Sequence, residues 1–228
     1  MYFNSGYFLF AIPGLLLAMW AQWLVKSTFS KYAQVPTSRG VNGITAANWI
    51  MQHTGLNNIG VNNIAGQLTD NYDPRAKVIN LSQSSVQDSV ASVAVVAHEL
   101  GHAEQDAQGY FPLRLRGAIV PAVQVSSWVG PLLFMAGYFL QSTGLAQIGL
   151  LAFIAGAFFA VVTLPVELDA SNRAMRNLES SGLLVGDELK GARKVLNAAA
   201  MTYVAAAAQS ILTVLYYVSL LTGMRRRD

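Results

Sequence analysis

The sequence predicts an α+β protein that is mostly helical, with about four transmembrane helices and one small soluble body. Hydrophobic residues make up 53% of the 228 residues and charged residues only 12%, whereas soluble proteins average about 25% charged residues. Most apolar residues gather in long segments that contain few charges. The stretch between the first two of these segments has the mixed polarity of a domain that folds in water.

The first predicted span covers residues 7–25, and Trp20, Trp23 and Lys26 mark its interfacial end. We expect it to be a retained anchor rather than a cleaved signal. Residues 1–4 carry no positive charge, and no small-residue cleavage site follows the apolar stretch.

Three further spans are predicted, over residues 119–140, 148–164 and 198–221. The second and third are joined by the short uncharged turn 141–144, which predicts a membrane hairpin. The Ala-rich part of the last span, residues 205–208, suits close helix packing, although Ala is also simply a good helix former.

Lys and Arg residues flank the predicted spans on the side of the soluble segments. By the positive-inside rule this side is cytoplasmic and the N-terminus lies outside. Arg225, Arg226 and Arg227 contradict this orientation if the fourth span crosses the bilayer fully. The chain has no cysteine, which excludes disulfides and thiolate ligands.

The soluble stretch is expected to contain a helix and short strands. Residues 42–53 have the periodicity of an amphipathic helix that ends at Gly55. Strand-like pieces at 59–64 and 77–81 flank a turn-rich connector, residues 68–74. The piece at 78–81 is either an edge strand, open to an extended peptide, or a covered strand in a small sheet.

The pentad His98-Glu99-Leu100-Gly101-His102 carries the strongest chemical signal. It lies in a predicted helix over residues 90–108, where His98 and His102, one turn apart, can bind one metal ion. Glu99 is then the general base for the attacking water, as in zinc peptidases. The alternative is a helix that happens to carry two histidines.

The remaining histidine, His53, lies near a helix end and is interpreted as a partner of the helix dipole. The sequence contains no Gly-x-Ser-x-Gly nucleophile elbow and no Gly-rich phosphate loop. The short C-terminal Arg cluster is insufficient to indicate nucleic acid, so no nucleic-acid partner is predicted.

Catalytic zinc sites use three protein ligands, so the two histidines require a third. Glu167 and Asp169, which follow Pro165 at the end of the third span, are the candidates. They are about 200° apart on a helix and face nearly opposite sides. The alternative role for these acids is at the N-terminus of a helix that begins at Pro165.

The chain resembles the YugP-type neutral zinc metallopeptidases, which are bacterial membrane proteins. The resemblance rests on residues 66–74, on the pentad at 98–102 and on the segment 165–171. It implies a gluzincin-like membrane peptidase in which Glu167 is the third zinc ligand. Relatives often place an Asp four residues after the ligand Glu to support the site. Here the residue four positions after Glu167 is Ser171, and the nearest Asp is Asp169, two positions after Glu167. Which of the two has this supporting role stays open.

We therefore expect an integral membrane zinc endopeptidase, Zn²⁺-dependent, with His98, His102 and Glu167 as metal ligands and Glu99 as the catalytic base. Its substrates would be membrane or membrane-proximal proteins, and membrane lipid would surround it. We expect it in a bacterial cell membrane, with the catalytic side facing the cytoplasm. Arg173 or Tyr72 could stabilise the oxyanion. The alternatives are a noncatalytic membrane scaffold or chaperone-like protein with a structural metal, and a transporter, which should show internal repeats.

The expected organisation follows from these assignments. It is a transmembrane anchor (1–25), a zincin-like catalytic region (26–118), a transmembrane hairpin (119–165), a third-ligand helix and linker (166–197) and a last transmembrane helix (198–224).

Overall fold

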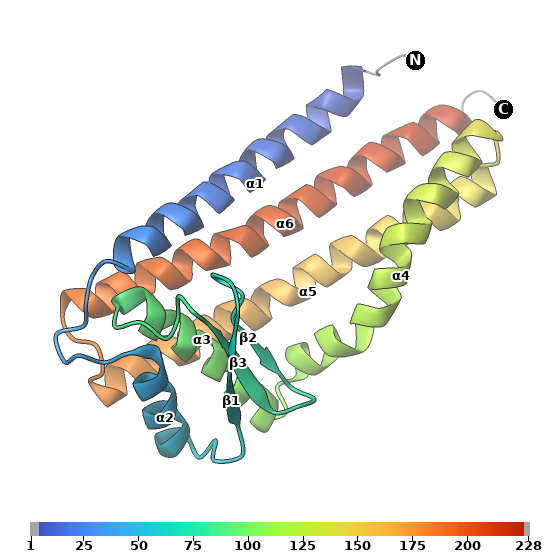
Figure 1. Cartoon of the computed structure of the whole chain (residues 1–228). Helices are drawn as coiled ribbons and strands as arrows, with labels where there is room; N and C mark the ends of the chain where they lie inside the picture. Colours follow the sequence, from blue (N-terminus) through green and yellow to red (C-terminus); the bar gives the residue numbers. More distant parts are fainter. Residues whose placement is uncertain (1–4, 226–228) are drawn as a thin grey trace. The chain divides into compact units, whose positions relative to one another are not determined.

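The computed structural model describes residues 5–225, which form two units (Figure 1). Residues 22–114 and 166–201 make up one unit, called here the sheet unit. The described residues outside these ranges make up the other, called here the membrane unit. The predicted mostly helical α+β class is confirmed. The first residues of the predicted anchor, 1–4, and the last two Arg residues of the C-terminal cluster lie outside the described part.

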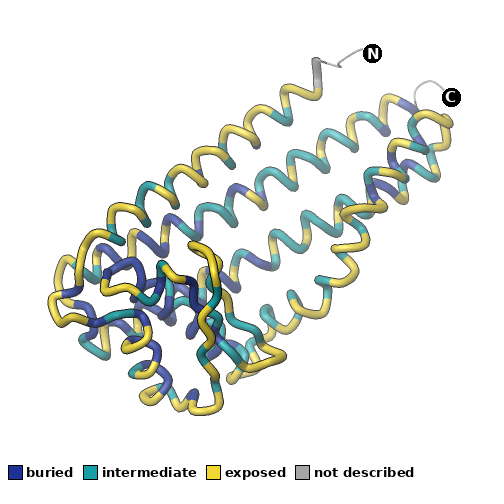
Figure 2. Tube along the Cα trace, viewed as in Figure 1, coloured by how far each residue is buried: buried dark blue, intermediate teal, exposed yellow. Residues whose placement is uncertain are grey.

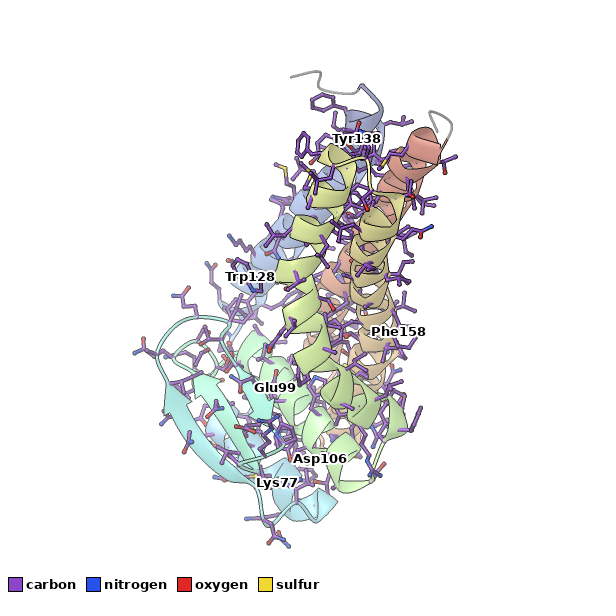
Figure 3. All side chains as sticks on the ribbon, turned by 90° about the vertical axis from the view of Figure 1, so that its right-hand side faces the viewer. Lys77, Glu99, Asp106, Trp128, Tyr138 and Phe158 are labelled. Atoms are coloured by element: carbon purple, nitrogen blue, oxygen red, sulfur yellow. The ribbon has the colours of Figure 1, made fainter. Side chains whose placement is uncertain are left out.

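Four helices carry the membrane unit: α1 (Ser5–Tyr32), α4 (Phe111–Phe139), α5 (Thr143–Ser181) and α6 (Asp187–Arg225). Within the described residues, each of them is long and apolar enough to cross a membrane. These helices expose many large apolar side chains. The yellow stretches of Figure 2 mark the exposed residues along them. Trp128, labelled in Figure 3, is 80% exposed. Such surfaces are unfavourable in water and suited to lipid, so the prediction of about four spans is confirmed.

All four helices extend beyond the predicted spans because they continue into the sheet unit: α1, α4, α5 and α6 supply residues to both units. The alternative in which a helix begins at Pro165 is excluded, since α5 runs through this residue. A proline removes one helical hydrogen bond. Beyond it, however, Val166, Ala170, Ala174 and Leu178 repeat every four residues and are fully buried, which stabilises the continuing helix.

The sheet unit begins with the helix predicted for residues 42–53, observed as α2 (Gly43–Thr54). The Asn42 side chain caps its N-terminus by accepting from the Thr45 backbone N–H. Gly55 ends the helix in the left-handed conformation, with φ of 73°, which glycine adopts without strain. The predicted helix and its glycine stop are therefore confirmed.

Three short strands form one sheet: β1 (Gly60–Ile64), β2 (Asn71–Asp73) and β3 (Val78–Ser82). The order is β1-β3-β2, with β1 parallel and β2 antiparallel to β3. Of the two alternatives for residues 78–81, the structure shows the covered strand and excludes the edge strand. Ile79 and Leu81 are fully buried, which places their strand at the centre. The strand β2 was not predicted, because three residues inside a turn-rich connector give no periodicity.

Helix α3 (Val90–Ala107) carries the pentad and forms the centre of the sheet unit (Figure 1). The Ser89 hydroxyl caps its start by accepting from the Ser92 N–H. Its small and branched residues from Val90 to Leu100 are largely buried and pack in one core with α2 and the sheet. The predicted helix over 90–108 is confirmed, and the core packs around the part of it that leads into the pentad.

Candidate metal centre

The two pentad histidines and Glu167 lie together, although Glu167 comes 65 positions after His102 in the sequence. The Glu167 Oε2 atom is 3.2 Å from His98 Nε2 and 3.5 Å from His102 Nε2. One potential ligand atom from each of the three side chains lies within 4.8 Å of the others. Glu167 is only 2% exposed, so its carboxylate faces the imidazoles rather than solvent.

Gly101 permits α3 and α5 to approach closely enough for this arrangement. A β-carbon at position 101 would lie 2.4 Å from the carbonyl oxygen of Ala170 and 3.1 Å from its Cα. Backbone atoms cannot move aside as a flexible side chain can. The glycine between the two histidines therefore has a packing role, which brings the helix of Glu167 to the helix of the pentad.

Each histidine has a second partner at its other ring nitrogen. Ser171 Oγ lies 3.2 Å from His98 Nδ1, and Gln105 Oε1 lies 3.0 Å from His102 Nδ1. Both imidazoles thus direct Nε2 toward Glu167 and Nδ1 toward a neutral oxygen, an arrangement typical of metal-binding histidines. Sequence reasoning left the role of Ser171 open and missed Gln105. The sequence signal that could have found Gln105 is its spacing: it comes three residues after His102, on the same face of a helix.

Asp169 does not belong to the three-residue cluster. Its Oδ2 atom accepts hydrogen bonds from Gln105 Nε2 at 2.9 Å and from Arg173 Nε at 2.6 Å. Arg173 also donates to Gln108 at 2.6 Å and lies near Glu104. Asp169 therefore supports the surroundings of the histidines through Gln105.

The two side chains considered for oxyanion stabilisation both have other partners. Arg173 is 9% exposed and is engaged by Asp169 and Gln108. The Tyr72 hydroxyl donates to Asp106 Oδ2 at 2.6 Å, and Lys77 contacts the same carboxylate. Lys77 and Asp106 lie next to one another in Figure 3. These bonds attach the sheet to α3.

Glu99 lies in α3 between the two histidines in sequence and is 8% exposed (Figure 3). Burial raises the pKa of Glu99 above its ordinary value, while the charges of His98 and His102 oppose that rise. A carboxylate with a raised pKa is a better proton acceptor near neutral pH than an ordinary glutamate. The site thus has a basic group beside its three potential ligands.

The donor set fits a zinc ion. Zinc accepts imidazole nitrogen at about 2.0–2.1 Å and carboxylate oxygen at about 2.0–2.2 Å, so tetrahedral ligand atoms are about 3.3 Å apart. The observed separations between Glu167 Oε2 and the two histidine nitrogens, 3.2 and 3.5 Å, match that spacing.

His53, the third histidine, is not part of this cluster. Its Nδ1 is 2.8 Å from the Trp49 carbonyl oxygen, and its ring stacks on Trp49.

Fold and cluster together define a membrane protein with a candidate metal site built from two histidines and a glutamate. The chain belongs to the family described as "Putative neutral zinc metallopeptidase", which matches residues 7–222. It is 42% identical over 215 residues to "Putative membrane protease YugP" of Bacillus subtilis (strain 168), covering 94% of this chain and 96% of that protein. No solved structure matches it. The resemblance stated from the sequence is confirmed, and the protein is a membrane member of a zinc metallopeptidase family.

Proposed function

We propose that the protein is a zinc-dependent endopeptidase that hydrolyses peptide bonds in membrane or membrane-proximal proteins. The observation that carries the proposal is the convergence of His98, His102 and Glu167 beside the buried Glu99. Family membership supports zinc as the metal and peptide bonds as the substrate. The gluzincin type follows if Glu167 is the third ligand.

In this proposal the two histidine Nε2 atoms and the Glu167 carboxylate hold the ion. Zinc bound in such a site supplies a Lewis acid and lowers the pKa of a coordinated water. Glu99 removes a proton from the attacking water and later delivers it to the leaving amine. Its raised pKa suits both steps, because the group must bind the proton and then release it.

The three-residue donor set favours a catalytic site over a structural one. Structural zinc sites are closed by four protein ligands, whereas catalytic sites use three and leave one position for water or substrate. Within the described residues, the only His and acidic group that can hold a metal is His98, His102 and Glu167. A noncatalytic scaffold with a structural metal is therefore the weaker alternative.

The substrate class follows from chain connectivity. Glu167 comes two residues after Pro165, the last residue of α5 that belongs to the membrane unit. A ligand so close in sequence to a membrane-spanning segment supports chemistry near the interface. Peptide segments in or beside the bilayer are then the natural substrates, with membrane lipid as the surrounding partner and no role for nucleic acid.

The proposed location is a bacterial cell membrane with the sheet unit on the cytoplasmic side, as the Lys and Arg distribution favours. The domain assignment is part of the same proposal: an anchor (1–25), a zincin-like region (26–118), a hairpin (119–165), a third-ligand helix and linker (166–197) and a last span (198–224).

The decisive experiment measures zinc and proteolysis on the same detergent-purified protein. Glu99→Gln should retain near-stoichiometric zinc, because the ligands remain, and lose activity by about 10²–10⁴-fold, because the general base is gone. Glu104→Gln, on the same helix, is the matched control and should remain active. A Glu99→Gln variant with undiminished turnover would refute the mechanism, and a wild-type protein that binds zinc without cleaving any peptide would favour the scaffold.

A further inference from the structure

Gln105 is a fully buried amide between the two helices that carry the candidate ligands. It lies on α3, one turn after His102, and is 0% exposed. Its Oε1 atom is 3.0 Å from His102 Nδ1. Its Nε2 atom donates to the Val166 carbonyl oxygen at 2.8 Å and to Asp169 Oδ2 at 2.9 Å, both on α5. Every polar atom of the side chain therefore has a partner.

These partners determine which way the amide points. The Val166 carbonyl and the Asp169 carboxylate can only accept hydrogen bonds, so the NH₂ group must face them. The amide oxygen must then face His102 and can only accept from it. It follows that the His102 Nδ1 atom carries a hydrogen, which leaves Nε2, the nitrogen that faces Glu167, as the one able to bind a metal ion.

His98 lacks an equivalent constraint. Its Nδ1 atom lies 3.2 Å from the Ser171 hydroxyl, which can either donate or accept. The serine is compatible with both tautomers, whereas the glutamine is compatible with one. The orientation of the two imidazoles is therefore controlled unequally, with the stricter control at His102.

We propose that Gln105 is a positioning residue that fixes the tautomer and ring orientation of His102 for metal binding. Because it also bonds the Val166 carbonyl, next to Glu167 in sequence, it couples the second histidine to the backbone of the third ligand. The inference rests on the proposed zinc site and goes beyond it by assigning a residue outside the pentad and outside the ligand set.

The test compares two glutamines on α3. Gln105→Met keeps a long unbranched side chain but removes the hydrogen bonds. Gln108→Met is the matched control, because Gln108 accepts from Arg173 in the same network without touching a histidine. Zinc affinity is measured on the full chain in detergent by competition with a chelator. Gln105→Met should bind zinc about 10–100-fold more weakly, the usual cost of losing such a partner, and Gln108→Met should bind as the wild type does.

A merely structural role would lower the thermal stability of apo Gln105→Met and leave the zinc affinity unchanged, which would overturn the inference. If Gln105→Met does not fold, the tautomer of His102 in the wild-type protein provides the test instead. Nitrogen NMR of zinc-loaded wild-type protein with ¹⁵N-histidine should show a hydrogen on His102 Nδ1 and metal on Nε2. Metal on Nδ1 would overturn the inference. Wild-type protein that fails to bind zinc would instead refute the proposed function, and with it the premise of this inference.

Discussion

The α-carbon of Gly101 lies so close to Ala170 that a β-carbon at position 101 would be 2.4 Å from the Ala170 carbonyl oxygen. This contact joins the helix of the two histidines to the helix of Glu167. The spacing of these two helices therefore decides whether the three candidate ligands can share one ion.

The first prediction concerns this contact. Gly101→Ala should destabilise the protein by about 1–3 kcal/mol through overpacking and should weaken zinc binding, because α3 and α5 must separate. Thermal unfolding and zinc competition measure the two effects. Gly117→Ala is the control, since a β-carbon there meets nothing within 4 Å. Unchanged stability and zinc affinity in Gly101→Ala would show that the helices are not in this contact.

The second prediction separates Glu167 from Asp169. Glu167→Ala should lose zinc and activity together, because it removes a ligand. Asp169→Ala should retain most zinc and lose part of its activity or stability, since Gln105 lies between Asp169 and His102. Metal analysis of the two purified variants provides the comparison. Full zinc occupancy in Glu167→Ala, with zinc lost in Asp169→Ala, would reverse the assignment.

The third prediction concerns the support of His98. Ser171→Ala removes the oxygen that lies 3.2 Å from His98 Nδ1. We expect zinc affinity to fall by about tenfold, at the lower end for partners of this kind, because water can replace a hydroxyl. Ser180→Ala provides the control, since Ser180 is exposed and its hydroxyl donates to the Asn177 carbonyl oxygen on the same helix. Equal zinc affinity in both variants would argue against a supporting role for Ser171.

The fourth prediction concerns orientation across the membrane. The chain has no cysteine, so an introduced one reports without background. A cysteine at Asn71, which is exposed in the sheet unit, should be protected from an impermeant thiol reagent in intact cells. A cysteine at Ser142, in the turn between α4 and α5, should react. The reverse labelling pattern would place the sheet unit outside.

Features encoded by neighbouring residues could be predicted from the sequence. The four apolar helices follow from runs of uncharged residues, and the boundaries of α2 follow from Asn42 and Gly55. The pentad helix follows from the absence of proline and from the Ala- and Val-rich run before His98. Each signal is local, because helical periodicity and capping depend on residues only a few positions apart.

The sequence by itself therefore determined the set of spans, the pentad and two candidate acids for the third ligand. The family resemblance then favoured Glu167 over Asp169. The tertiary structure decided that α5 continues through Pro165 and that β3 lies between two strands. It also placed Glu167 beside the histidines, Asp169 beside Gln105, and Gln105 beside His102. These relationships join residues from separate helices or strands, or depend on the direction of a single side chain. Packing and hydrogen-bond geometry determine them, and local sequence patterns carry no such information.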